Sequence, residues 1–222
     1  MPSCVIDHLV VTAPTLDSGA AFVRCALGVE MQVGGEHPRM GTHNLLLRLG
    51  DSVFLEVLSP NPDAPPPSRA RWFGLDALRP DAPPALRARV ARTNNIQTAV
   101  AAAPEPLGSI EPMSRGTLDW HITIPGDGVM PFDGIAPAVI DWHAPSHPAA
   151  GLQDRGLSLV GLELFHPEAQ RLSDLLLALG LEGSCSVAEP DQGDGPSLVA
   201  RIDTPGGRRV LRIGSPEPGP GS

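Results

Sequence analysis

The motif Ala-Leu-Gly, followed by an aliphatic residue and Glu, occurs twice in the chain, at residues 26–30 and 178–182. Each copy closes a segment whose apolar residues recur at helical spacing, namely Leu16, Ala20, Val23 and Leu27, then Leu172, Leu175, Leu176 and Leu179. Gly28 and Gly180 stand where a helix C-cap needs left-handed backbone. Thr15 can cap the first helix, and Pro167 suits the first turn of the second. This self-similarity indicates that one supersecondary unit recurs along the chain.

Three further segments resemble one another where strands are expected to end, at residues 53–60, 138–145 and 209–216. Each is a short run with strand character that is stopped by a proline, a residue that cannot continue a sheet ladder. Gly-Thr pairs at 41–42 and 116–117 each lead into another strand pattern. Together with the helix repeat, these segments predict three copies of the order strand, helix, three strands.

The predicted units have the following bounds. Unit one, residues 1–60, has a helix at 16–27 and strands near 5–11, 29–34, 43–49 and 53–58. Unit two, residues 86–150, has a helix near 95–103 and strands near 88–92, 107–112, 118–124 and 136–142. Unit three, residues 157–216, has strands near 158–164, 184–188, 197–202 and 208–213. We expect a proline-rich linker or lid at 61–85 and a disordered tail at 217–222.

The charge and the cysteines exclude several classes of function. The formal net charge is −9 and the arginines form no basic stripe, so we expect no nucleic-acid partner. No apolar run approaches the ~20 residues of a membrane span, so we expect no membrane partner. Cys4, Cys25 and Cys185 show no CxxC spacing and are interpreted as reduced, buried thiols of a cytoplasmic protein. The phosphate-binding glycine motifs are absent too, which argues against a nucleotide cofactor.

The chain resembles the vicinal-oxygen-chelate superfamily, and within it the glyoxalase-like domain branch, in several short segments. These are 6–11 (Ile-Asp-His-Leu-Val-Val), 26–29 (Ala-Leu-Gly-Val), 37–44 (His-Pro-Arg-Met-Gly-Thr-His-Asn), 54–57 (Phe-Leu-Glu-Val), 140–142 (Ile-Asp-Trp) and 147–148 (His-Pro). The resemblance covers most of the chain. It implies an α+β fold in which βαβββ units form a curled mixed β-sheet with helices on its outer face. In metal-using members, a His of the first strand and a Glu of the fourth chelate a divalent ion, and these positions are His8 and Glu56.

The pattern of the residues supports the same pair independently. His8 shares a strand face with Ile6 and Val10, and Glu56 lies between apolar neighbours on its own strand. A buried carboxylate must be paired, hydrated or metal-bound, because burying it alone is costly. Imidazole and carboxylate together suit Fe, Mn, Ni, Co or Zn. The alternatives are an ion pair of Glu56 with Arg48 and a plain hydrogen-bonded His8.

Further candidates come from the repeats and from the segments that carry the resemblance. Asp141 stands at the position of Glu56 in unit two and is the best third metal ligand, with His121 a distant fourth. The position of His8 corresponds to about Arg89 in unit two, so the ligand pair is not duplicated. The predicted substrate-binding residues are Asn44, Trp120, His121, Trp142 and His147. Tryptophan pairs can form the walls of an apolar pocket, although both are equally expected in a core.

Two functions therefore remain open. The first is a metal-dependent lyase, isomerase or dioxygenase acting on a small oxygenated substrate, with Glu56 also moving a proton. The second is a metal-free protein that binds or sequesters a small molecule, as in antibiotic resistance. The missing second ligand pair favours the binder. Since βαβββ units can pair within a chain or between chains, a homodimer is one expected arrangement.

Overall fold

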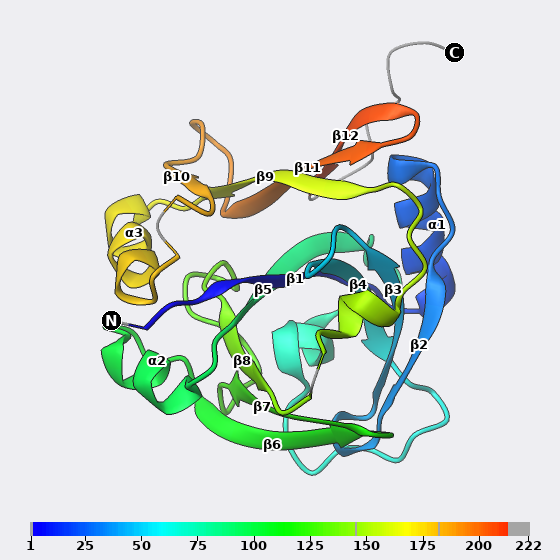
Figure 1. The fold of residues 1–222 in the computed structure, drawn as a ribbon, viewed down its shortest axis with the longest axis horizontal. Helices are drawn as coiled ribbons and strands as arrows, with labels where there is room; N and C mark the ends of the chain where they lie inside the picture. Colours follow the sequence, from blue (N-terminus) through cyan, green and yellow to red (C-terminus); the bar gives the residue numbers. More distant parts are fainter. Residues whose placement is uncertain (1, 145, 182, 213–222) are drawn as a thin grey trace.

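The computed structural model describes residues 2–144, 146–181 and 183–212 (Figure 1). The tail predicted at 217–222 lies outside the described residues. The first two units supply two helices and eight strands: β1 (Val5–Thr12), α1 (Leu16–Leu27), β2 (Gln32–His37), β3 (Thr42–Arg48) and β4 (Phe54–Pro60), then β5 (Ala85–Arg92), α2 (Ile96–Ala102), β6 (Ser109–Arg115), β7 (Leu118–Ile124) and β8 (Ala138–Trp142).

These strands form one curled sheet in the order β2-β3-β4-β1-β5-β8-β7-β6. Strands β1 and β5 pair antiparallel at its centre, and each also pairs parallel with the last strand of its own unit. The edge strands β2 and β6 approach each other, so the sheet curls into a nearly closed barrel (Figure 1). The α+β curled-sheet fold that the sequence predicted is confirmed.

Helix α1 shows why the sequence folds this way locally. The Thr15 hydroxyl accepts from the Ser18 N–H at 3.2 Å, and Gly28 ends the helix with φ of 73°. Gly19 packs the helix on the outer face of β4, where a Cβ at this position would lie 2.3 Å from Val57 Cγ1. Both predicted caps of α1 are therefore present. Because α1 covers the face of β4 that carries Val57, the opposite face of β4 lies inside the barrel.

The third unit forms a separate four-stranded sheet. It contains β9 (Ser158–Phe165), α3 (Ala169–Ala178), β10 (Ser186–Ala188), β11 (Ser197–Thr204) and β12 (Gly207–Arg212), in the strand order β10-β9-β11-β12. It packs beside α1 and over the outer side of β5, and its leucines join the same hydrophobic core (Figure 1). Because β2 and β6 close on each other, the curled sheet offers this unit no edge to extend. Pro167 precedes the α3 N-cap, Glu168, and so lies outside the first turn where we predicted it.

The segment between units one and two passes across the interior of the curled sheet (Figure 1). It contains a short 3-10 turn, Trp72–Ala77, whose Trp72 side chain is buried. Arg71 donates from Nε to Gly41 O in unit one, and Arg69 donates to Ile124 O in unit two. This connection therefore covers the inside of the barrel and is tied to both units.

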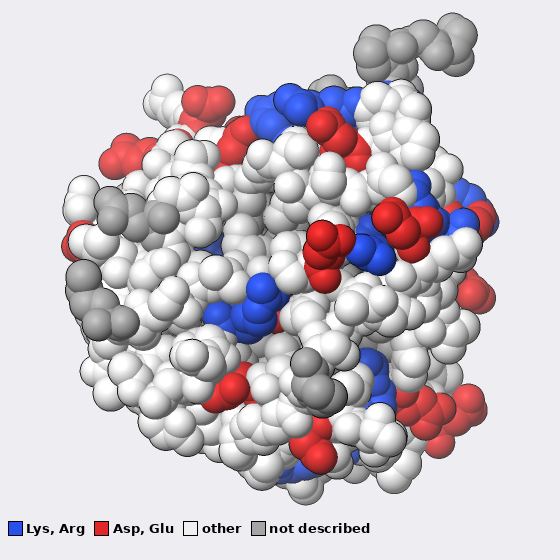
Figure 2. All heavy atoms as spheres, viewed as in Figure 1, with Lys and Arg blue, Asp and Glu red and all other residues white. Residues whose placement is uncertain are grey.

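Three global expectations can be compared with the structure. Cys4 is buried and Cys185 half-buried, but Cys25 is exposed, so the prediction that all three thiols are buried is wrong for Cys25. It falls on the solvent side of α1, beside the exposed Arg24. Acidic and basic side chains are interspersed on the face shown in Figure 2. None of the helices in the described part of the chain has the length and apolar content of a membrane span.

Candidate ligand-binding site

His8 and Glu56 meet inside the curled sheet. Their strands pair parallel, with Val10 opposite Glu56, and His8 Nε2 lies 3.6 Å from Glu56 Oε2. Both residues are buried, with exposed fractions of 5% and 6%. The His8 ring stacks on Phe54 with 4.4 Å between ring centroids. The two groups that the sequence singled out therefore face one hollow, side by side.

Asp7 contacts the ring nitrogen of His8 that does not face Glu56. Its Oδ1 lies 2.5 Å from His8 Nδ1, while its Oδ2 accepts from Trp142 Nε1 at 3.0 Å and faces His147 Nε2 at 2.8 Å. Burial raises the pKa of the Asp7 carboxyl, but the hydrogen bonds from His147 and His8 outweigh it and hold the pKa well below its usual range. An ionised carboxylate only accepts, so the proton of His8 sits on Nδ1. The Nε2 lone pair of a neutral His8 then points towards Glu56.

Asn44 fixes the other oxygen of Glu56. Its Nδ2 donates to Glu56 Oε1 at 2.5 Å, and its Oδ1 accepts from the Gly35 N–H at 2.8 Å. A Cβ on Gly34 would lie 2.1 Å from Asn44 Oδ1, so this position requires glycine. Glu56 is thus held by one oxygen and presents the second to His8.

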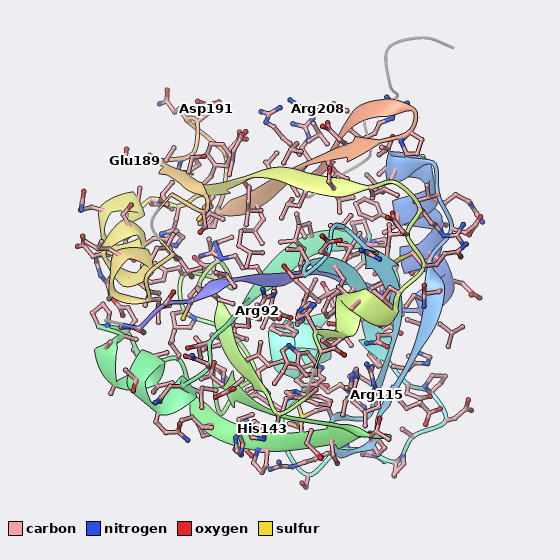
Figure 3. All side chains as sticks on the ribbon, viewed as in Figure 1. Arg92, Arg115, His143, Glu189, Asp191 and Arg208 are labelled. Carbon is pink, nitrogen blue, oxygen red and sulfur yellow. The ribbon has the colours of Figure 1, made fainter. Side chains whose placement is uncertain are left out.

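Arg115 brings a positive charge to the same hollow, at the seam between β2 and β6 (Figure 3). Its Nη1 lies 3.3 Å from both His37 Nε2 and Asn44 Oδ1. Burial, together with this cation, lowers the pKa of His37 to about 3, so the ring is neutral and its Nδ1–H donates to Thr42 Oγ1. Arg115 forms no ion pair with a carboxylate in the described part of the chain, and its charge is available to a ligand.

Aromatic and aliphatic side chains complete the walls. They are Leu46, Phe54, Trp72, Phe73, Trp120, Ile122, Ile140 and Trp142. The rings of Trp120 and Trp142 lie 5.1 Å apart. The centre of a water-sized sphere has about 30 Å³ available inside the hollow, which is therefore narrow. An apolar lining with a few convergent polar groups is typical of a small-molecule site.

The structure brings some predicted residues into this hollow and leaves others out. Asn44, Trp120 and Trp142 line it beside His8 and Glu56. Asp141 does not, because Ile140 and Trp142 face inward and alternate residues of a strand face opposite sides. The Asp141 carboxylate instead accepts from the Ile96 N–H at 3.4 Å.

His121, His147 and Arg48 also lie elsewhere. His121 is opposite Asp141 in the sheet, and its ring packs on His143. His147 lines a neighbouring hollow; it contacts Asp7, and its ring lies 5.9 Å from that of Phe54, so it supports the site from outside. Arg48 bonds Gly50 O and Asp51, so the alternative ion pair of Arg48 with Glu56 is wrong.

The donor set does not match a resident metal ion. Within residues 2–144, 146–181 and 183–212, no three His, Cys, Asp or Glu side chains are placed to hold one. Val90 lies opposite His8 on β5, and Ala138 lies opposite Val90 on β8, so the positions of unit two that lie in register with His8 add no donor. Catalytic zinc sites, for comparison, use three protein ligands. The predicted ligands His8, Glu56 and Asp141 are therefore not brought together. His8 and Glu56 alone would leave most coordination positions of an ion to other donors.

The sequence interpretation did not single out four residues of the site: Asp7, His37, Trp72 and Arg115. Asp7 and His8 should face opposite sides of a regular strand, but the pairing of β1 with β5 shifts register between Ile6 and His8. The Gly34-Gly35 pair was an available signal, since glycine inside a strand often marks a close approach of other groups. A Cβ on Gly35 would lie 2.9 Å from Arg115 Cδ.

Residues 6–180 match the family described as glyoxalase-like domain. No curated protein matches the sequence. A hypothetical protein from Staphylococcus aureus has a similar fold, with a TM-score of 0.58, 14% identity, and coverage of 96% of this chain and 86% of that one. 4-Hydroxymandelate synthase from Streptomyces coelicolor gives a TM-score of 0.48 at 16% identity, covering 98% of this chain and 64% of that one. Methylmalonyl-CoA epimerase from the same organism gives 0.44 at 18%, covering 67% and 100%.

Proposed function

Because the chain belongs to the glyoxalase-like domain family, we propose that its hollow binds a small oxygenated anion and that Glu56 moves a proton to or from it. One observation supports this most. The Glu56 carboxylate, fixed by Asn44, faces the imidazole of His8 inside an aromatic hollow that also contains the cation of Arg115.

Recognition would divide between charge and shape. The guanidinium of Arg115 is a strong donor for a carboxylate or enolate oxygen, since charge-assisted bonds are roughly twice as strong as neutral ones. The aromatic walls would hold a flat apolar body. A ligand anchored in this way places its next atoms towards Glu56, because Asn44 contacts both Arg115 and Glu56.

Proton transfer follows from the arrangement of lone pairs. Glu56 Oε2 and His8 Nε2 lie 3.6 Å apart, and a proton shared between these two atoms would relieve the repulsion between their lone pairs. Glu56 would take a proton from a carbon next to a carbonyl group, and His8 would stabilise the protonated pair, since Asp7 balances an imidazolium. Arg115 would stabilise the charge that develops on the substrate oxygen. The reaction class is isomerisation or elimination through an enolate.

A metal-dependent reaction is a less supported version of this proposal. His8 and Glu56 would hold a divalent ion only with further donors from the substrate, and the chemistry supplied there would be that of a Lewis acid. The second candidate function is a metal-free binder without chemistry, which the extensive aromatic lining favours.

Deuterium exchange tests the proposal. Small carbonyl acids are incubated with the protein in D₂O, and loss of the carbon-bound proton is followed by NMR. We expect exchange that Glu56→Gln slows by about 100-fold or more, since general acid–base groups contribute that range. Binding of the same acids without exchange would support the binder and overturn the catalytic role.

Metal content of untagged protein gives the second readout. Stoichiometric Fe, Mn, Ni, Co or Zn in the wild type that is lost in His8→Ala would overturn the metal-free version. Sub-stoichiometric metal, unchanged by that substitution, supports it.

A further inference from the structure

The buried indole of Trp72 carries a hydrogen-bond donor that the protein does not use. Trp72 belongs to the connection over residues 61–84, lines the hollow and is 5% exposed. Its Nε1 is buried and has no acceptor in the described part of the chain. Leaving a buried N–H without a partner is energetically unfavourable, so such groups are rare in folded proteins. An acceptor from outside the protein would recover this energy.

Trp72 and Arg115 lie on the same side of the hollow. Both contact His37, whose ring is 5.0 Å from the Trp72 ring between centroids and whose Nε2 is 3.3 Å from Arg115 Nη1. His37 itself is neutral and has both ring nitrogens engaged. Near this ring, the Trp72 N–H has no acceptor and the Arg115 guanidinium, which contacts His37 and Asn44, has no carboxylate partner within the described residues. One neutral N–H and one guanidinium suit the two oxygens of a carboxylate.

The backbone around Trp72 is held firmly in a strained form. Phe73 has φ of 56°, a conformation that is uncommon for a bulky residue. The Gly74 N–H donates to Gly128 O at 3.1 Å, and a Cβ on Gly128 would overlap Arg71 O at 1.9 Å. Strain of this kind persists only where the surroundings impose it, and it often marks a ligand clamp.

We propose that Trp72 and Arg115 together bind the carboxylate of a flat, monoanionic acid, with the connection 61–84 closed over it. One carboxylate oxygen accepts from Trp72 Nε1 and the other from Arg115. The body of the acid lies among Phe54, Trp120 and Trp142. This inference rests on the proposed ligand-binding function and adds the chemical class of the ligand and a specificity residue.

Binding of benzoate, phenylacetate and 3-phenylpropionate, each compared with its primary amide, tests the proposal by calorimetry. Each amide keeps the shape of its acid and loses the charge. We expect at least one acid to bind more tightly than its amide by 10-fold or more, and Trp72→Phe to weaken that acid about 10-fold, the loss expected for a hydrogen bond to a charged group. Trp72→Phe keeps the ring and removes only the N–H.

Phe22→Leu is the control for a general effect on packing, because Phe22 packs against the core but does not line the hollow. We expect it to change acid binding less than 3-fold. Equal losses in Trp72→Phe and Phe22→Leu, or no acid preferred over its amide, would overturn the proposal. Binding is also measured in Glu56→Gln, which should retain the acid preference. A preference for acids without deuterium exchange would support the carboxylate site and contradict the catalytic role of Glu56. Deuterium exchange without a preference for acids would support the catalytic role and contradict the carboxylate site.

Discussion

Replacing His37 with Asn should make the stability of the protein less sensitive to acid. His37 is buried, and in the folded protein its pKa is about 3 against 6.5 in an unfolded chain. Below pH 6.5 the unfolded chain therefore binds a proton at His37 that the folded protein does not bind. The free energy of unfolding is thus unaffected by His37 above pH 6.5 and decreases as the pH falls from 6.5 towards 3. Asn retains a polar group where Nδ1 meets Thr42 and removes the titration.

The size of the effect follows from the two pKa values. One pH unit of differential proton binding is worth about 1.4 kcal/mol, and between pH 7 and pH 5 the change amounts to about 2 kcal/mol for this residue. Carboxyl groups titrate mainly below pH 5 and contribute less over this interval. The difference in the free energy of unfolding between pH 7 and pH 5 should thus be about 2 kcal/mol smaller in His37→Asn than in the wild type.

Urea unfolding at pH 5, 6 and 7 and constant ionic strength measures this difference. Met40→Ala provides the control, since Met40 is fully buried near the same turn and carries no charge. It should lower stability by about 2–5 kcal/mol at all three pH values alike. Parallel pH profiles for the wild type and His37→Asn would refute the claim that a neutral buried His37 shapes acid stability.

Gly34→Ala, with Gly126→Ala as its control, tests the packing of the site, and Arg89→Met tests a buried charge. Gly34→Ala should lower the free energy of unfolding by about 1–3 kcal/mol and displace Asn44, because its Cβ would collide with Asn44 Oδ1. Gly126→Ala has open space around it and should lower the free energy of unfolding by well under 1 kcal/mol. Chemical unfolding measures both. Arg89→Met should raise the free energy of unfolding by about 1–3 kcal/mol, because burial lowers the pKa of Arg89 to about 10 and both terminal nitrogens lack a partner in the described residues. A lower melting temperature in Arg89→Met would show that this guanidinium has a stabilising partner, such as bound water or an anion.

Local patterns in the chain were sufficient for many elements. The helix predicted at 16–27 spans Leu16–Leu27, and the strand predicted at 118–124 spans Leu118–Ile124. The weak pattern of β5 was harder to place, since the strand begins at Ala85 rather than near 88. Most residues of β5 are buried, because one face lies inside the curled sheet and the other lies beneath β11 and β12, so a simple inside–outside alternation does not apply.

Local patterns in the sequence determined the bounds of elements such as α1 and β7 and the strands on which His8 and Glu56 lie, because helix caps, strand alternation and proline stops act over a few residues. The resemblance to the vicinal-oxygen-chelate superfamily implied that His8 and Glu56 form a pair. Tertiary structure alone decided that Arg115 and Trp72 join that pair, that Asp141 turns away from it, and that Asp7 fixes the tautomer of His8. Those contacts depend on how a sheet curls, where its register shifts and which strand edges meet. Such features arise from packing between residues far apart in the chain, and no local pattern encodes them.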